Sequence, residues 1–190
     1  MVRRLSYNGL FMCGWDGVSN CPGKITDNNN LYLYSMKFYP SRSLFIDFDD
    51  DNYKDKESMA LAGYDYILSH PNTMIFGHSA GGDSAILIFR EIHKSQIKDF
   101  DNVAGILIMD PGMGTSTISS KELIDYLRIG IENNVKVFIA LTASEADNYY
   151  APLNVFDVDN YKLVVYDSLT HSNISSSDQV LNDFFNFIGK

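Results

Sequence analysis

The sequence has 190 residues, 45% hydrophobic and 21% charged, which is enough to bury one hydrophobic core, and we expect a single domain over residues 1–190. Its formal net charge of -9 argues against nucleic acid or an anionic membrane as a partner, because both require basic side chains that neutralise phosphates. No stretch approaches the roughly 20 apolar residues of a transmembrane helix. We expect a protein without stable membrane insertion, cytoplasmic or soluble as given, or secreted if a signal peptide has been removed.

The chain has two cysteines, Cys13 and Cys21, which lie close together in the sequence. They could close a small disulfide loop or remain free thiols, and the sequence leaves both possibilities open. Neither has the neighbouring Cys or His residues that hold a structural zinc ion. We therefore expect no metal and no cofactor.

The N-terminal third of the chain predicts two strands and two helices. A glycine-bearing loop, residues 14–19, follows the first strand, and an acidic loop, residues 47–51, follows the second. The expected elements are a strand at 9–13, a helix at 27–39, a strand at 43–48 and a helix at 55–69. The apolar side of the helix at 55–69 is predicted to comprise Met59, Leu61, Ala62, Tyr66 and Ile67.

The stretch 73–86 carries the clearest chemical signal. Its apolar residues 74–76 predict a buried strand, the sequence Gly77-His78-Ser79-Ala80-Gly81 predicts a sharp turn, and small residues then begin a helix. A serine on so tight a turn has a strained backbone, and only glycine at the flanking positions avoids a clash between strand and helix. A glycine-rich turn of a nucleotide-binding or purely structural α/β unit is the alternative.

The remaining elements alternate between strand and helix. They are a strand at 103–109, a helix at 119–133, strands at 135–141 and 162–166, and a helix at 176–188. This alternation predicts a three-layer αβα sandwich around a mostly parallel six-stranded sheet. Ligands of such sheets bind at the carboxyl ends of the strands, and the candidate residues at those ends are Gly14, Ser79, Asp110, Asp147 and His171.

A serine hydroxyl becomes a nucleophile when a histidine takes its proton, and the histidine needs a carboxylate to fix its tautomer. His171 follows the last predicted strand and is the best candidate for the base. His78 lies inside the turn and is expected to line or support the site. Asp147, after the fifth strand, is favoured as the acid, while Asp110, after the fourth strand, and Glu145 remain open.

These motifs resemble those of the α/β-hydrolase family, most closely its small bacterial lipases and esterases that lack a lid. The segment Cys13–Ser19 resembles the family's H-G-x-G-G-x-S oxyanion loop, Gly77–Gly81 resembles its nucleophile turn, and Ser144–Asp147 resembles its S-S-A-D turn. The order serine, acid, histidine is also that of the family. The resemblance implies Ser79 as nucleophile, His171 as general base and Asp147 as the acid that orients it.

The resemblance further implies that the backbone N–H groups of Trp15 and Ala80 form the oxyanion hole. Cys13 and Trp15 depart from the histidine and the small aliphatic residue that these lipases usually have, so the acyl pocket is expected to differ in shape. The residues expected at the substrate are Gly14, His78, Met113 and Tyr149, with Trp15 and Tyr150 as further apolar candidates.

The sequence therefore predicts a minimal α/β hydrolase without a cap domain, since one loop and one helix separate the fourth and fifth strands. The expected reaction is hydrolysis of carboxylic esters, of small molecules or lipids, through an acyl-serine intermediate. Thioester or amide hydrolysis by the same residues remains an alternative, as does a non-catalytic binding protein with a hydrolase fold. The oligomeric state is not predicted.

Overall fold

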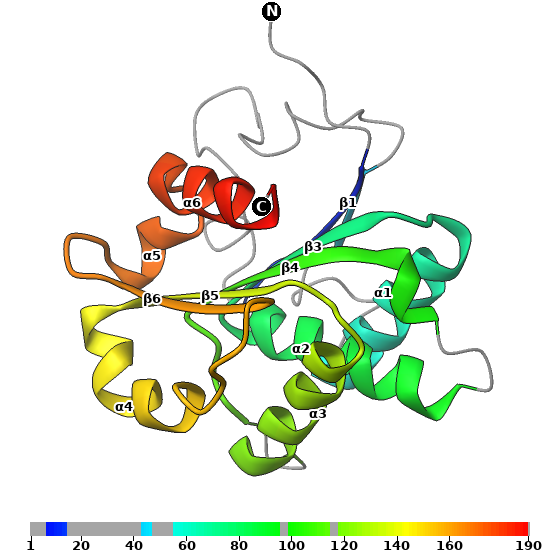
Figure 1. Cartoon of the computed structure of the whole chain (residues 1–190), viewed down its shortest axis with the longest axis horizontal. Coiled ribbons are helices and arrows are strands. Elements are labelled where there is room, and N and C mark those ends of the chain that lie inside the picture. Colours follow the sequence, from blue (N-terminus) through cyan, green and yellow to red (C-terminus); the bar gives the residue numbers. More distant parts are fainter. Residues whose placement is uncertain (1–6, 15–42, 47–54, 96–98, 115–117, 190) are drawn as a thin grey trace, which may run out of the picture.

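Six parallel strands form one sheet in the computed structural model, in the order β2-β1-β3-β4-β5-β6 (Figure 1). The structure describes residues 7–14, 43–46, 55–95, 99–114 and 118–189. The strands are β1 (Asn8–Met12), β2 (Ser43–Ile46), β3 (Thr73–His78), β4 (Val103–Met109), β5 (Val137–Thr142) and β6 (Tyr161–Tyr166). Each corresponds to a strand expected from the sequence, so the predicted parallel sheet is confirmed.

The described helices lie between and after these strands. They are α1 (Lys56–Ser69), α2 (Ala80–Lys94), the 3-10 helix η4 (Asp99–Asn102), α3 (Ser120–Glu132), α4 (Ala143–Leu153), α5 (His171–Ile174) and α6 (Asp178–Ile188). The described residues between β4 and β5 contain one helix, α3, as expected for a fold without a cap domain there. The sequence interpretation did not include α4, α5 or η4.

Helices cover both faces of the sheet, with α1, α2 and α3 on one face and α6 on the other (Figure 1). Successive residues of a strand therefore enter two separate cores: Ile75 of β3 packs in the core on the side of α1 to α3, whereas Met74 and Phe76 pack with α6. Strands buried on both faces are apolar almost throughout, which is the pattern that predicted them. The three-layer αβα sandwich is confirmed.

α1 buries most of the face predicted for it. Met59 and Ile67 are fully buried, and Ala62 and Tyr66 pack against the same core. Leu61, also expected on the apolar side, is 51% exposed, so the prediction was wrong at that residue. The sequence interpretation also did not include Gly63, which is buried. A Cβ atom at position 63 would lie 2.8 Å from Ile88 Cδ1, so glycine allows α1 to approach α2.

The chain crosses from one side of β1 to the other after β2, since β2 and β3 flank β1. Such a point of reversal opens a crevice at the carboxyl ends of the strands, where ligands of parallel α/β sheets bind. Gly14 follows β1 and Ser79 follows β3. Both residues therefore border the crevice.

Four sequence predictions fall outside the described residues: the helix at 27–39, the acidic loop at 47–51, and the positions of Trp15 and Cys21. Cys13 is disulfide-bonded, and Cys21 is the only other cysteine of the chain. Within the part of the chain that is described, no helix is long and apolar enough to cross a bilayer.

Candidate active site

Ser79 occupies the sharp turn between β3 and α2, with a φ of 54° and a ψ of -124°. A non-glycine residue rarely adopts this conformation, and it persists only where the surrounding structure enforces it. The backbone N–H of Ser79 donates to the Met109 carbonyl oxygen at 3.0 Å, which ties the turn to β4. Although Ser79 is the N-cap residue of α2, its hydroxyl does not cap the helix. The strain and the uncommitted hydroxyl are those expected of a nucleophile turn.

The two glycines of the motif are required by close backbone contacts. A Cβ atom on Gly81 would lie 2.1 Å from the Met12 carbonyl oxygen, and one on Gly77 would lie 2.5 Å from the Gly81 carbonyl oxygen. No side chain can occupy those positions without moving backbone. The clash predicted from the G-x-S-x-G pattern is therefore present at both flanking glycines.

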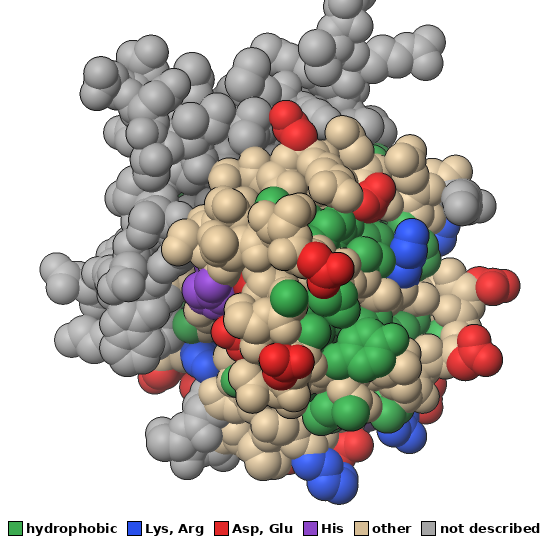
Figure 2. Space-filling model, turned by 90° about the vertical axis from the view of Figure 1, so that its left-hand side faces the viewer, with side chains coloured by type: hydrophobic (Ala, Val, Ile, Leu, Met, Phe, Trp, Pro, Cys, Tyr) green, Lys and Arg blue, Asp and Glu red, His purple; other side chains and the backbone are tan. Residues whose placement is uncertain are grey.

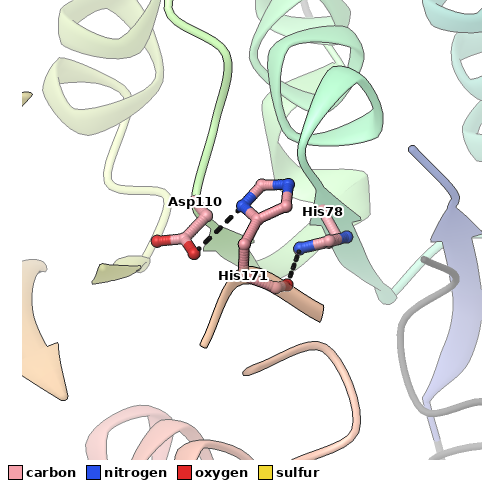
Figure 3. Close-up of side chains that lie close together, drawn as sticks. All are labelled: His78, Asp110 and His171. Atoms are coloured by element: carbon pink, nitrogen blue, oxygen red, sulfur yellow. Dashed lines mark hydrogen bonds and ion pairs between the residues drawn. The ribbon is translucent and has the colours of Figure 1, made fainter. Parts of the chain in front are cut away.

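His171 is paired with Asp110 (Figure 3). His171 begins α5, after β6, and its Nδ1 lies 3.2 Å from Asp110 Oδ2. Asp110 follows β4 with a φ of 40°, and its side chain is fully buried, whereas the His171 side chain is 40% exposed. The other ring nitrogen of His171 points away from Asp110 (Figure 3). This geometry lets the carboxylate fix the orientation of the imidazole and leaves its distal nitrogen turned away from the acid.

The structure thus pairs His171 with Asp110 and not with Asp147, which the sequence had favoured. Asp147 lies on α4, is exposed, and makes no hydrogen bond or ion pair with His171. The segment 144–147 is the first part of a helix that starts directly at the end of β5, and not a turn that returns to the histidine. Glu145, the other alternative, is half-buried on the same helix and also does not contact His171 by a hydrogen bond.

Thr142 supports Asp110, a role that the sequence interpretation missed. Its backbone N–H donates to Asp110 Oδ1 at 2.7 Å, and its hydroxyl donates to Oδ2 at 3.0 Å. Thr142 is also the N-cap residue of α4, yet its side chain makes no capping bond. Threonine is often found at N-cap positions because its hydroxyl oxygen can accept a hydrogen bond from a backbone N–H of the first helical turn. Here the hydroxyl orients the carboxylate instead.

His78 lies beside His171 and is fully buried. Its Nε2 donates to the backbone carbonyl oxygen of His171 at 2.8 Å, and the two ring centroids are 4.6 Å apart (Figure 3). The bond joins the end of β3 to the first residue of α5. Of the two roles expected for His78, lining or supporting the site, the structure has the supporting one.

The carboxylate environment favours the charged form of His171. The hydrogen bond that His171 donates to Asp110 raises the pKa of His171 most, burial lowers it, and the charges of Asp110 and Glu145 raise it further, so the pKa lies above its ordinary value. A histidine with a raised pKa is a stronger base once it is deprotonated. The pair can therefore accept a proton and stabilise the resulting imidazolium.

The other predicted site residues differ in their positions. A Cβ atom on Gly14 would lie 2.7 Å from Ser79 Cβ, so Gly14 lies directly against the serine. Ala80 is the first residue of α2 and is 5% exposed. Met113 is 3% exposed and packs in the core on the side of α1 to α3. Tyr149 is half-buried on α4, with its hydroxyl 3.5 Å from the Gly112 carbonyl oxygen, and Tyr150 is 41% exposed.

His78, Asp110 and His171 each offer one ligand atom, and these atoms lie within 4.8 Å of one another, a spacing that one metal ion could span. In the structure the Asp110 carboxylate is hydrogen-bonded to the His171 side chain and to Thr142, and the His78 side chain is hydrogen-bonded to the His171 backbone. Histidine and carboxylate ligands would suit a borderline cation such as zinc. The hydrogen bonds account for the arrangement without one.

Comparison with known proteins relates the chain to hydrolases through its fold. The sequence matches no family model and no curated protein. Among solved structures, it is similar to a lipase-esterase related protein from Clostridium acetobutylicum, with a TM-score of 0.57, 12% identity, and coverage of 95% of this chain and 94% of that one. A marine microorganism esterase gives a TM-score of 0.58 at 14% identity, over 97% of each chain. The Vlm2 thioesterase domain gives 0.53 at 14% identity, over 95% of this chain and 91% of that one. The chain has the α/β-hydrolase fold that these structures share.

Proposed function

We propose that the protein is a serine hydrolase that cleaves carboxylic esters through an acyl-serine intermediate, with Ser79 as nucleophile, His171 as general base and Asp110 as the acid. The observation that carries this proposal is the buried Asp110 carboxylate on His171 Nδ1, together with a serine in a strained turn whose backbone N–H is bonded to Met109, the residue before Asp110. Acid and base lie 61 residues apart in the sequence and follow different strands, β4 and β6. The hydrolase fold agrees with this assignment.

The reaction follows from these positions. His171 takes the proton of the Ser79 hydroxyl as the oxygen attacks the carbonyl carbon, and it then gives that proton to the departing alkoxide, which leaves as the alcohol. A water molecule, activated by the same histidine, releases the acid and restores the serine. Asp110 holds the imidazole in the productive tautomer and stabilises its charged form.

The developing oxyanion needs hydrogen-bond donors. Ala80 is the first residue of α2, and the first N–H groups of a helix have no acceptor within it. Its N–H, at the positive end of the helix dipole, is the donor we propose, together with the N–H of Trp15, which lies outside the described residues. Gly14 leads into Trp15 directly from its contact with Ser79.

The charges around the site favour an ester with an uncharged alcohol. A histidine side chain reaches the surface on the face that carries α4 and α5, with both acidic and basic side chains near it and an apolar patch further away (Figure 2). Glu145, Asp147 and Asp167 follow β5 and β6 without an ion pair among the described residues. Lys56 and Lys121, the described cations at helix starts on this edge, are both paired with acids.

A phosphate-bearing leaving group such as coenzyme A would require cations that are free to bind it. Thioester hydrolysis is nevertheless the second candidate, because the Vlm2 thioesterase domain shares the fold. The two are separated by comparing kcat/KM for a short p-nitrophenyl ester, an acyl-coenzyme A and the phosphate-free thioester of N-acetylcysteamine. We expect the ester to be preferred and coenzyme A to be the poorest leaving group.

Activity itself is tested with p-nitrophenyl esters of short and long acyl chains. The wild type is expected to hydrolyse them and Ser79→Ala to lose about 10⁶ in kcat, as expected when the nucleophile of a triad is removed. Equal rates for the two proteins would remove Ser79 from the mechanism.

A further inference from the structure

A buried ion pair joins Lys56, the first residue of α1, to Asp83, the fourth residue of α2. The Asp83 side chain is fully buried and that of Lys56 is 13% exposed. The Asp83 backbone N–H donates to the Ser79 carbonyl oxygen at 3.3 Å, as expected in the first turn of a helix. Neither side chain makes a described hydrogen bond to Ser79, Asp110 or His171, so the proposed reaction does not use the ion pair itself.

The pair holds the loop that follows Asp110. Asp83 Oδ1 accepts from the Met113 N–H at 2.9 Å and Oδ2 accepts from the Gly114 N–H at 3.4 Å, while Lys56 Nζ donates to the Gly114 carbonyl oxygen at 2.7 Å. Gly112 passes so close that a Cβ atom there would lie 3.1 Å from Asp83 Oδ2. Side chains of α1 and α2 therefore contact three consecutive residues of this loop, residues 112–114.

The loop needs stabilising contacts because its backbone is strained. Asp110 has a φ of 40° and Met113 a φ of 49°. Both values lie in the left-handed region, which residues other than glycine rarely adopt. Gly114 follows with a φ of 145°. Conformations of this kind persist only where neighbouring contacts determine them. The contacts from Asp83 and Lys56 are the buried polar contacts that reach this loop from α1 and α2.

A buried ion pair contributes little net stability, because the free energy of removing two charges from water offsets their attraction. Apolar side chains of similar size would often stabilise the fold as well. Burial raises the pKa of Asp83, and Lys56 and the two backbone N–H groups lower it. Tyr149 on α4 is a further titratable group near the pair, and its pKa is raised by burial first, then by the charge of Glu145 and then by that of Asp83. The described contacts of the pair instead fix the position of the loop that follows Asp110.

We propose that Lys56 and Asp83 are positioning residues that set Asp110 against His171, an inference that rests on the proposed function. Asp83 lies one helical turn after Ser79 on α2, so the pair fixes the loop of the acid to the helix that begins at the nucleophile. The serine and the acid are thereby held in register although they end different strands.

The test uses Asp83→Asn, Lys56→Gln and the double variant, with the exposed α3 pair Lys121→Gln and Asp125→Asn as a matched control. Each single variant is expected to lose ten- to a hundredfold in kcat with KM within twofold, since small displacements of catalytic groups cost this much. The double variant, which leaves no unpaired buried charge, is expected to recover part of the loss. The control variants should match the wild type.

A readout independent of turnover separates this inference from the proposed function. Histidine ring protons followed by NMR give the pKa of His171, assigned with His171→Gln, and this pKa should fall in the single variants because the Asp110 hydrogen bond that raises it is weakened. Failure of Ser79→Ala to abolish hydrolysis would refute the proposed function and leave this measurement intact.

Gly112→Ala provides a second perturbation that buries no charge. Its Cβ would lie 3.1 Å from Asp83 Oδ2 and 3.4 Å from Lys56 Nζ, so the loop must move by a few tenths of an ångström while the protein stays folded. We expect a loss of several fold in kcat and a lower pKa of His171. An unchanged kcat and an unchanged His171 pKa in Gly112→Ala, or in any folded variant of the pair, would overturn the inference.

Discussion

Replacement of Asp110 by asparagine separates the acid seen in the structure from the one favoured by the sequence. Asp110 accepts three hydrogen bonds, from the Thr142 N–H at 2.7 Å, from the Thr142 hydroxyl at 3.0 Å and from His171 Nδ1 at 3.2 Å. Asparagine can keep the first bond through its carbonyl oxygen. Its amide nitrogen then faces the other two groups as a donor.

An amide donor at this position forces the wrong tautomer on His171. Nδ1 must accept a hydrogen bond, so the ring proton moves to Nε2, which can no longer take the proton of Ser79. The corresponding change in a serine protease lowers kcat about 10⁴-fold, which is about 5.4 kcal/mol of transition-state stabilisation at 1.36 kcal/mol per decade. We expect a loss of this order for Asp110→Asn and a change within a few fold for Asp147→Asn, because Asp147 is exposed on α4.

The assay is the hydrolysis of a p-nitrophenyl ester over a range of pH, with thermal unfolding of each variant as a control for folding. The activity of the wild type should rise as His171 loses its proton, above the ordinary pKa of histidine. A folded Asp110→Asn protein with the wild-type rate, together with an inactive Asp147→Asn protein, would refute the geometry described here.

Three further predictions concern the surroundings of the site. Gly81→Ala should lower the free energy of unfolding by about 3 kcal/mol, because its Cβ would lie 2.1 Å from a backbone oxygen of β1. Gly82→Ala should lower this free energy less, because its nearest contacts are at 3.3 Å. Chemical denaturation measures both variants. His78→Phe leaves the buried carbonyl oxygen of His171 without its donor and should cost about 1–3 kcal/mol of stability and lower kcat, while His78→Gln, which restores a donor, should recover part of both. The pKa of His171 is raised in the folded protein, so its stabilising contribution is complete below the unfolded pKa of about 6.5 and is lost as the pH rises through the folded pKa; unfolding measured between pH 6 and 9 should show this loss in the wild type and not in Asp110→Asn.

The sheet could be predicted from the sequence because its central strands are buried on both faces and therefore read as apolar runs. The serine was found because the G-x-S-x-G pattern describes a local backbone requirement that the contacts of Gly77 and Gly81 confirm. His171 was found because it follows the last strand. All three inferences depend on short-range features of the chain.

The partner of the histidine could not be predicted in the same way. Asp110 and Asp147 both follow strands that end at the same edge of the sheet, so position along the chain does not separate them. What separates them is the helix that begins directly at Ala143 and carries Asp147 away on its exposed side. Ala143, Glu145 and Ala146 are good helix formers, which was the available signal.

The contacts that orient the acid are also invisible in the sequence. Thr142 is a residue type common at helix N-caps. Its hydrogen bond to Asp110 becomes evident only when β4 and β5 are paired in the sheet. Lys56 and Asp83 lie 27 residues apart and meet because α1 and α2 pack together. Long-range polar contacts of this kind follow from the fold and not from a local pattern.

The central claim, an acyl-serine intermediate at Ser79, is tested most directly by mass spectrometry of the protein after brief reaction with a slowly deacylating p-nitrophenyl ester. We predict one acyl group per chain on the peptide that contains Ser79, none in Ser79→Ala, and much slower labelling in Asp110→Asn. An active protein that carries no acyl group, or carries it on another residue, would contradict the account.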